Sequence, residues 1–78
     1  MEERYTYELE NLGKNIKKFR KRKKLTQLDL EVKCGVDNGD ISRIENGRKN
    51  LELYTIVKLA EALDVDLHEL FVKDTSNK

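Results

Sequence analysis

The chain has 78 residues, of which 40% are charged, and its formal net charge at pH 7 is +1. A chain of this length forms one small domain with a modest core, so helix packing or self-association must support its stability. The single cysteine, Cys34, excludes a disulfide framework and fits a reducing compartment. No apolar run approaches the roughly 20 residues that span a bilayer, and the acidic start is not typical of a signal peptide. We therefore expect a cytoplasmic protein with no membrane partner.

The charges are unevenly distributed along the chain. Residues 1–10 contain four acids and one base, whereas residues 14–24 contain eight bases and no acid. Such a separation creates a basic pole on a nearly neutral protein, as nucleic-acid binding requires. A solvated helix face explains the same run of bases, so the charge pattern alone does not decide between the two.

Glycine and asparagine divide the chain into five helical stretches, with little of the alternation typical of strands. The first helix is expected from about Tyr7 to Lys23. Within it Leu9, Leu12, Ile16 and Phe19 recur at helical spacing and form one apolar stripe. Five lysines point away from that stripe, namely Lys14, Lys17, Lys18, Lys21 and Lys24, and Arg20 lies at its edge.

The next two helices are short and have clear end signals. The second is expected to follow the N-cap Thr26 and to run to Cys34, where Gly35 ends it. The third is expected to follow Asp37 and to end near residues 46–47, an Asn-Gly pair typical of a helix C-terminus.

Two further helices complete an all-α chain. The fourth is expected over Leu53–Leu63, where apolar residues recur at helical spacing. The fifth is short, and Asp66 and Glu69 are spaced like a capping pair at its start. The sequence therefore predicts a compact, all-α domain of five helices.

The third helix has a distinct outward face. Ile41 and Ile44 are its large apolar residues and define the buried direction. The residues that then face outward or project from the N-terminal tip are Asn38, Gly39, Ser42, Arg43 and Asn46. Asp37 and Asp40 occupy the N-cap and the first turn, where free N–H groups and the positive end of the helix dipole favour carboxylates. Gly39 lets another backbone approach the helix, although chance variation at a surface explains it equally well.

Two short helices joined around Gly35, with a basic helix before them, describe a helix-turn-helix. The stretch "LTQLDLEVKCGVDNGDISRIENGRKNLELYTIVKLAEALDV" resembles the Cro/C1-type (XRE) helix-turn-helix family. The elements that carry the resemblance are Thr26-Gln27, Leu30, Gly35, Ile41-Ser42, Ile44-Glu45, Gly47 and "KLAEAL" at 58–63. It covers roughly residues 12–71, and the single-domain form also resembles the controller proteins of restriction–modification systems.

The resemblance implies a five-helix domain that binds operator DNA as a homodimer, with its third helix in the major groove. Residues 12–72 would form this DNA-binding and dimerisation domain, residues 1–11 an N-terminal extension of the first helix, and residues 73–78 a disordered tail. The family's base-reading positions fall on Asn38, Gly39, Ser42 and Arg43. Its phosphate-contacting positions fall on Thr26, Gln27, Asn46, Arg48, Lys49 and Asn50.

The resemblance also suggests a buried ion pair between Arg20 and Glu45. Helical wheels place each at the edge of its buried face, and two ordinary surface charges are the alternative. Glu31 departs from the small alanine common in the family, so its carboxylate must leave along the surface or find a partner. Residues 50–52, Asn-Leu-Glu, replace a stronger capping sequence and predict a weak N-cap for the fourth helix.

The fifth helix carries a compact apolar cluster of Leu67, Leu70 and Phe71. Such a surplus near a chain end predicts a dimer interface, although the three residues could instead only seal the core of the monomer. His68 is the only histidine, so neither a His-containing triad nor a plausible metal cluster can be assembled. We expect no cofactor and no enzyme activity, and we expect Cys34 to be a small buried hydrophobe.

The sequence thus predicts a transcriptional regulator that binds a palindromic DNA operator as a homodimer, with no small-molecule ligand evident. An antitoxin or a phage-type repressor uses the same fold and is the alternative within this class. A protein-interaction module that has lost operator binding is the alternative from another class. The near-zero net charge and Gly39 favour that module weakly, whereas Arg43, Arg48, Lys49 and the eight bases before Thr26 argue against it.

Overall fold

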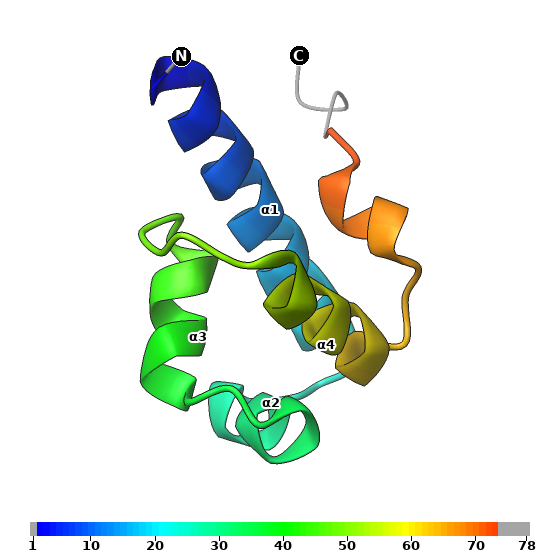
Figure 1. Ribbon diagram of the computed structural model, residues 1–78. Helices are drawn as coiled ribbons and strands as arrows, with labels where there is room; N and C mark the ends of the chain where they lie inside the picture. The colour runs from blue at the N-terminus through cyan, green and yellow to red at the C-terminus, as the bar shows by residue number, and fades with distance from the viewer. Residues whose placement is uncertain (1, 74–78) are drawn as a thin grey trace.

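The computed structural model describes residues 2–73, which form four α-helices and one 3-10 helix (Figure 1). These elements are α1 (Glu2–Arg22), α2 (Gln27–Cys34), α3 (Asn38–Glu45), α4 (Leu53–Leu63) and η1 (Leu67–Phe71). The all-α class agrees with the prediction. The fifth element differs, because it is a 3-10 helix and not an α-helix. Its five residues are too few for an α-helix without neighbours, and short i→i+3 turns of this kind are common connectors.

Helix α1 begins at Glu2, well before the expected start near Tyr7. Glu2 and Glu3 lie in its first turn, where the helix dipole favours acids. One turn further along, α1 contacts the other end of the described chain: Lys73 forms an ion pair with Glu8, and its ammonium lies 4.7 Å from the centre of the Tyr7 ring. Of the tail expected at 73–78, residues 74–78 lie outside the described residues.

One cluster of apolar side chains forms the core, with contributions from all five elements. The fully buried large side chains are Ile16, Leu30, Ile41, Ile44, Leu59, Leu63 and Leu70. Helix α1 contacts α3, α4 and η1, while α2 contacts α3 and α4. Figure 1 shows α2 and α3 toward one end of the molecule and η1 toward the other. The two helices of the predicted helix-turn-helix are thus neighbours at one end of a shared core.

Two polar or small residues of α1 fix the elements around it. A Cβ atom added to Gly13 would lie 2.3 Å from the carbonyl oxygen of Ile44, so glycine allows α1 and α3 to approach this closely. The buried side chain of Asn15 donates hydrogen bonds to the carbonyl oxygens of Leu70 and Val72, at 2.8 and 2.9 Å. Helix α1 therefore positions both α3 and the end of η1.

The helix ends follow the capping rules with one exception. The Thr26 hydroxyl accepts a hydrogen bond from the Asp29 N–H, and the Asp29 carboxylate accepts one from the Thr26 N–H, each at 2.9 Å. Gly35 ends α2 in the left-handed conformation, with φ of 78°. Glu52 makes no side-chain hydrogen bond at the start of α4, which agrees with the weak N-cap expected there.

Candidate nucleic-acid interface

The N-terminus of α3 is capped by the carboxylate of the residue that precedes it. The Asp37 side chain accepts a hydrogen bond from the Gly39 N–H at 2.9 Å. A Cβ atom on residue 39 would lie only 2.9 Å from that same Asp37 oxygen. The only close contact is with the end of a flexible side chain, which can shift, so the structure leaves open whether Gly39 serves DNA approach or is chance variation.

The outward face of α3 carries the predicted base-reading side chains. Asn38 and Arg43 are exposed and Ser42 is half-buried, while Ile41 and Ile44 on the opposite side are buried. The predicted inward and outward directions of α3 therefore agree with the burial of its residues. Gly39 has no side chain to offer a base, so it can only bring its backbone close to one.

Two side chains of this face are paired with carboxylates of the same chain. Glu31 of α2 accepts hydrogen bonds from the backbone N–H and the side-chain amide of Asn38, at 3.0 and 2.6 Å. The guanidinium of Arg43, whose side chain is 58% exposed, forms an ion pair with Asp40. Lys49 lies 3.9 Å from the same Asp40 carboxylate. Asn38 and Arg43 therefore each have a carboxylate partner within the protein.

The carboxylate of Glu31 has thus found a partner, which the sequence left undecided. It bonds to the tip of α3, and α2 and α3 remain in contact. The pair joins residues seven positions apart across the turn, so no helical spacing rule could have found it. The Asp40–Arg43 pair could have been predicted more easily from the sequence, because residues three apart on a helix are neighbours.

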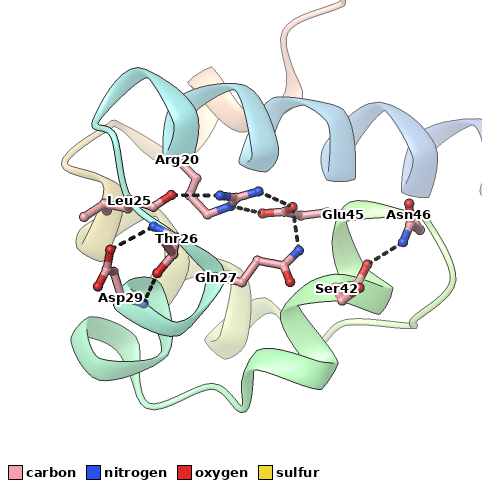
Figure 2. Close-up of polar contacts among 8 residues, drawn as sticks. All are labelled: Arg20, Leu25, Thr26, Gln27, Asp29, Ser42, Glu45 and Asn46. Carbon is pink, nitrogen blue, oxygen red and sulfur yellow. Dashed lines mark hydrogen bonds and ion pairs between the residues drawn. The ribbon is translucent and has the colours of Figure 1, made fainter.

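A buried ion pair connects α3 to α1 on the side opposite its outward face (Figure 2). The Arg20 guanidinium donates to both carboxylate oxygens of Glu45, from Nε at 2.7 Å and from Nη2 at 3.0 Å. These hydrogen bonds hold the pKa of Arg20 above its ordinary value. Arg20 also donates to the carbonyl oxygen of Leu25, and Gln27 donates to Glu45 at 3.1 Å. One network therefore connects α1, the start of α2 and the end of α3.

The predicted phosphate-contacting residues lie at the ends of the two motif helices. Thr26 and Gln27 are at the start of α2, where the first N–H groups have no partner within the helix and favour an anion. Asn46 follows the last residue of α3, and its side chain donates to the carbonyl oxygen of Ser42 at 3.0 Å. The loop after α3 carries the remaining three, namely Arg48, Lys49 and Asn50, of which Arg48 and Asn50 are exposed.

Two further basic residues lie beside the predicted phosphate-contacting residue Asn46. Lys14 and Lys17 of α1 line a surface hollow together with Glu10, Glu45 and Asn46. The run of bases in the sequence pointed to this helix but not to individual residues, because helix spacing does not show which bases approach α3. Lys14 and Lys17 are therefore candidate phosphate contacts that sequence reasoning did not single out.

The described residues offer neither a metal site nor a membrane span. Between residues 2 and 73, no group of three or more His, Cys, Asp and Glu residues could hold a metal ion. No helix in the same part of the chain is long and apolar enough to cross a membrane. Cys34 is a free, partly buried thiol that packs against the core.

Comparisons with known proteins agree with the helix-turn-helix arrangement of α2 and α3. A family model described as "Helix-turn-helix" matches residues 16–70. The transcriptional repressor RghR of Bacillus subtilis (strain 168) is 39% identical over 66 residues, which are 83% of this chain and 49% of RghR. The chain thus spans about half the length of that relative. Control protein C.MunI of a Mycoplasma species is 37% identical over 60 residues, which are 76% of this chain and 81% of C.MunI.

A solved structure shows the same fold. The restriction-modification controller protein C.AhdI from Aeromonas hydrophila superposes with a TM-score of 0.78 and 36% sequence identity, covering 81% of this chain and 96% of C.AhdI. The family match extends over well more than half of the chain. The chain therefore belongs to the Cro/C1-type (XRE) helix-turn-helix family, whose members are non-enzymatic DNA-binding regulators.

Proposed function

We propose that this protein is a sequence-specific transcriptional regulator that places α3 in the major groove of a palindromic operator and binds it as a homodimer. One observation carries the proposal: α3 presents Asn38, Ser42 and Arg43 outward, while the buried pair of Arg20 and Glu45 holds the helix to α1 from behind. A face of polar side chains on a rigidly supported helix is what direct contact with base edges requires.

The side chains divide into two roles. Arg43 has the paired donors that match guanine O6 and N7, and Asn38 has the donor and acceptor that match adenine. Ser42 can donate to or accept from either kind of base. The phosphate contacts would come from the start of α2 and from the loop after α3, and such contacts fix the register of the protein on the duplex.

The dimer interface is proposed on η1, with help from α4. Leu67 and Phe71 are 36% and 39% exposed, so both offer apolar surface. Leu70 has no exposed surface, so it belongs to the monomer core and not to the interface. Helix α4 contacts η1 and adds the exposed apolar residues Leu53 and Val57. Two copies joined here would present two α3 helices to two half-sites.

Two alternatives remain as outcomes of the test. An antitoxin or a phage-type repressor would bind DNA through the same face and would differ in the gene it controls. A protein-interaction module would not bind DNA sequence-specifically, and the pairing of Asn38 and Arg43 with Glu31 and Asp40 favours it. In either regulator the protein would act in the cytoplasm.

Selection from a random duplex library, followed by binding measurements at several salt concentrations, tests the proposal. We expect one palindromic sequence to be enriched and its affinity to fall steeply as salt rises, because Lys and Arg contacts release counterions. The Arg43→Ala variant should relax the preference at one base pair of the selected sequence while it keeps binding to random DNA. If no sequence is enriched and binding is independent of salt, the protein is an interaction module.

A further inference from the structure

Glu31 and Asn38 are joined by two hydrogen bonds that converge on one oxygen. The Glu31 Oε1 atom accepts from the backbone N–H of Asn38 at 3.0 Å and from its side-chain Nδ2 at 2.6 Å. We propose that Glu31 is a positioning residue that determines which base pair Asn38 recognises. This inference rests on the proposed function, since it requires Asn38 to contact a base.

The chemistry of the amide gives Glu31 this role. An asparagine side chain carries two N–H donors and one carbonyl acceptor, and rotation of the amide by half a turn exchanges their positions. Adenine presents an acceptor and a donor in a fixed order in the major groove, and other base pairs present different orders. Because Nδ2 of Asn38 is held on Glu31, the carbonyl oxygen and the second N–H keep one fixed order toward the groove.

The backbone bond strengthens the effect. The N–H of Asn38 is at the first position of α3 and has no partner within the helix, so Glu31 satisfies it from α2. The same carboxylate therefore fixes the main chain and the side chain of Asn38 relative to α2. Glu31 is itself half-buried between the two helices, which restricts its own movement.

A purely electrostatic role for Glu31 predicts a different outcome. A carboxylate near the tip of α3 repels phosphates of every sequence, so its removal would strengthen binding to all DNA alike. Positioning instead affects one base pair and leaves the others unchanged. Glu31→Gln separates the two, because glutamine loses the charge but keeps a side-chain oxygen that can accept from Asn38.

The experiment begins with a duplex selected by the wild-type protein from a random library. Dissociation constants are then measured for that duplex and for variants with each of the other base pairs at each position. Asn38→Ala identifies the base pair that Asn38 reads. The test variants are Glu31→Ala and Glu31→Gln, with Glu3→Ala on the exposed first turn of α1 as the control for a lost negative charge.

We expect Glu31→Ala to reduce discrimination at the Asn38 base pair on the order of tenfold, while discrimination at the Arg43 base pair stays unchanged. Glu31→Gln should keep discrimination at both base pairs and bind all duplexes more tightly, and Glu3→Ala should behave like wild type. Full discrimination by Glu31→Ala at the Asn38 base pair would overturn the inference and leave the proposed function intact. If wild-type protein selects no sequence, the proposed function and this inference both fall.

A second measurement does not depend on DNA. In the nuclear magnetic resonance spectrum of the free protein, the side-chain NH₂ of Asn38 should show one proton shifted by its bond to a carboxylate and slowed exchange with solvent. Both features should disappear in Glu31→Ala and not in Glu3→Ala. Identical Asn38 side-chain signals in wild type and Glu31→Ala would contradict the positioning role even where the variants fold equally well.

Discussion

Arg20 and Glu45 form a two-point ion pair, with distances of 2.7 and 3.0 Å between the guanidinium nitrogens and the carboxylate oxygens. Their side chains are 9% and 2% exposed, so both charges are almost completely removed from water. Helices α1 and α3 are thereby joined at the last residue of α3. The orientation of the proposed DNA-binding helix thus depends on a pair of charges that must be present together.

Removal of one member of this pair should destabilise the protein strongly. Glu45→Ala leaves the Arg20 guanidinium buried without its partner, which costs roughly 3–5 kcal/mol of unfolding free energy. That is a large part of the stability of a small domain. The double variant Arg20→Met/Glu45→Leu should lose much less, because it buries no charge. Urea unfolding followed by circular dichroism measures both, and a Glu45→Ala transition that coincides with wild type would contradict the buried pair.

Arg43 and Lys49 should have different effects on DNA binding. Arg43→Ala should weaken binding to the selected operator by roughly 1–3 kcal/mol and relax the preference at one base pair. Lys49→Ala should weaken binding to all sequences alike, because it removes a phosphate contact. The slope of the logarithm of the binding constant against the logarithm of the salt concentration should become shallower by about one unit. Titrations of selected and random duplexes at several salt concentrations distinguish the two. Equal losses on both duplexes for Arg43→Ala would assign Arg43 to phosphate.

Asp40 should restrain the side chains of Arg43 and Lys49 in the free protein, since both approach its carboxylate. Asp40→Asn releases them and removes a negative charge near the phosphates. We expect random duplexes to be bound about three- to tenfold more tightly, whereas the gain on the operator should be smaller. Asp64→Asn is the control, because Asp64 is an exposed residue at the end of α4 whose left-handed backbone suits asparagine. An equal effect of the two variants would exclude restraint by Asp40.

The capping box at the start of α2 should make stability depend on acid pH. Hydrogen bonds from Thr26 lower the pKa of Asp29 in the folded protein. A lowered folded-state pKa contributes stability that is fully present above the unfolded value of about 3.9 and is lost as the pH falls through the folded value. The difference in Tm between wild type and Asp29→Asn should therefore be constant well above the unfolded value and shrink as the pH falls below it. A difference that does not change with pH would contradict this role of the Asp29 charge.

Local rules on the sequence were sufficient for much of this molecule. The cap at Asp37 and the outward face of α3 follow from residue type and helical period, and the burial of Ile41 and Ile44 agrees with them. The early start of α1 was missed, although Glu2 and Glu3 are acids of the kind that the positive end of a helix dipole favours. The partner of Glu31 could not be predicted from the sequence, since its bond to Asn38 depends on the geometry of the turn between two helices.

The proposed dimer interface on η1 is inferred from the apolar side chains that remain exposed beside the core. Leu70 is fully buried, whereas Leu67 and Phe71 are 36% and 39% exposed on the same short helix. Apolar side chains of this size gain free energy when a second copy covers them. One α3 helix contacts only a few base pairs, so two helices about 34 Å apart are needed for a long palindromic site and high affinity.

Phe71→Asp places a charge in the proposed interface and should separate the two copies without unfolding them, because Phe71 is not part of the buried core. We expect a helical circular dichroism spectrum, a monomer in sedimentation equilibrium and a steep loss of operator affinity. Val32→Asp is the matched control, since Val32 is 81% exposed on α2 and lies outside η1 and α4. It should sediment as a dimer. If the wild-type protein sediments as a monomer far above its DNA-binding concentrations, then Leu67 and Phe71 only cover the core of a monomer, and the palindromic mode of binding requires another interface.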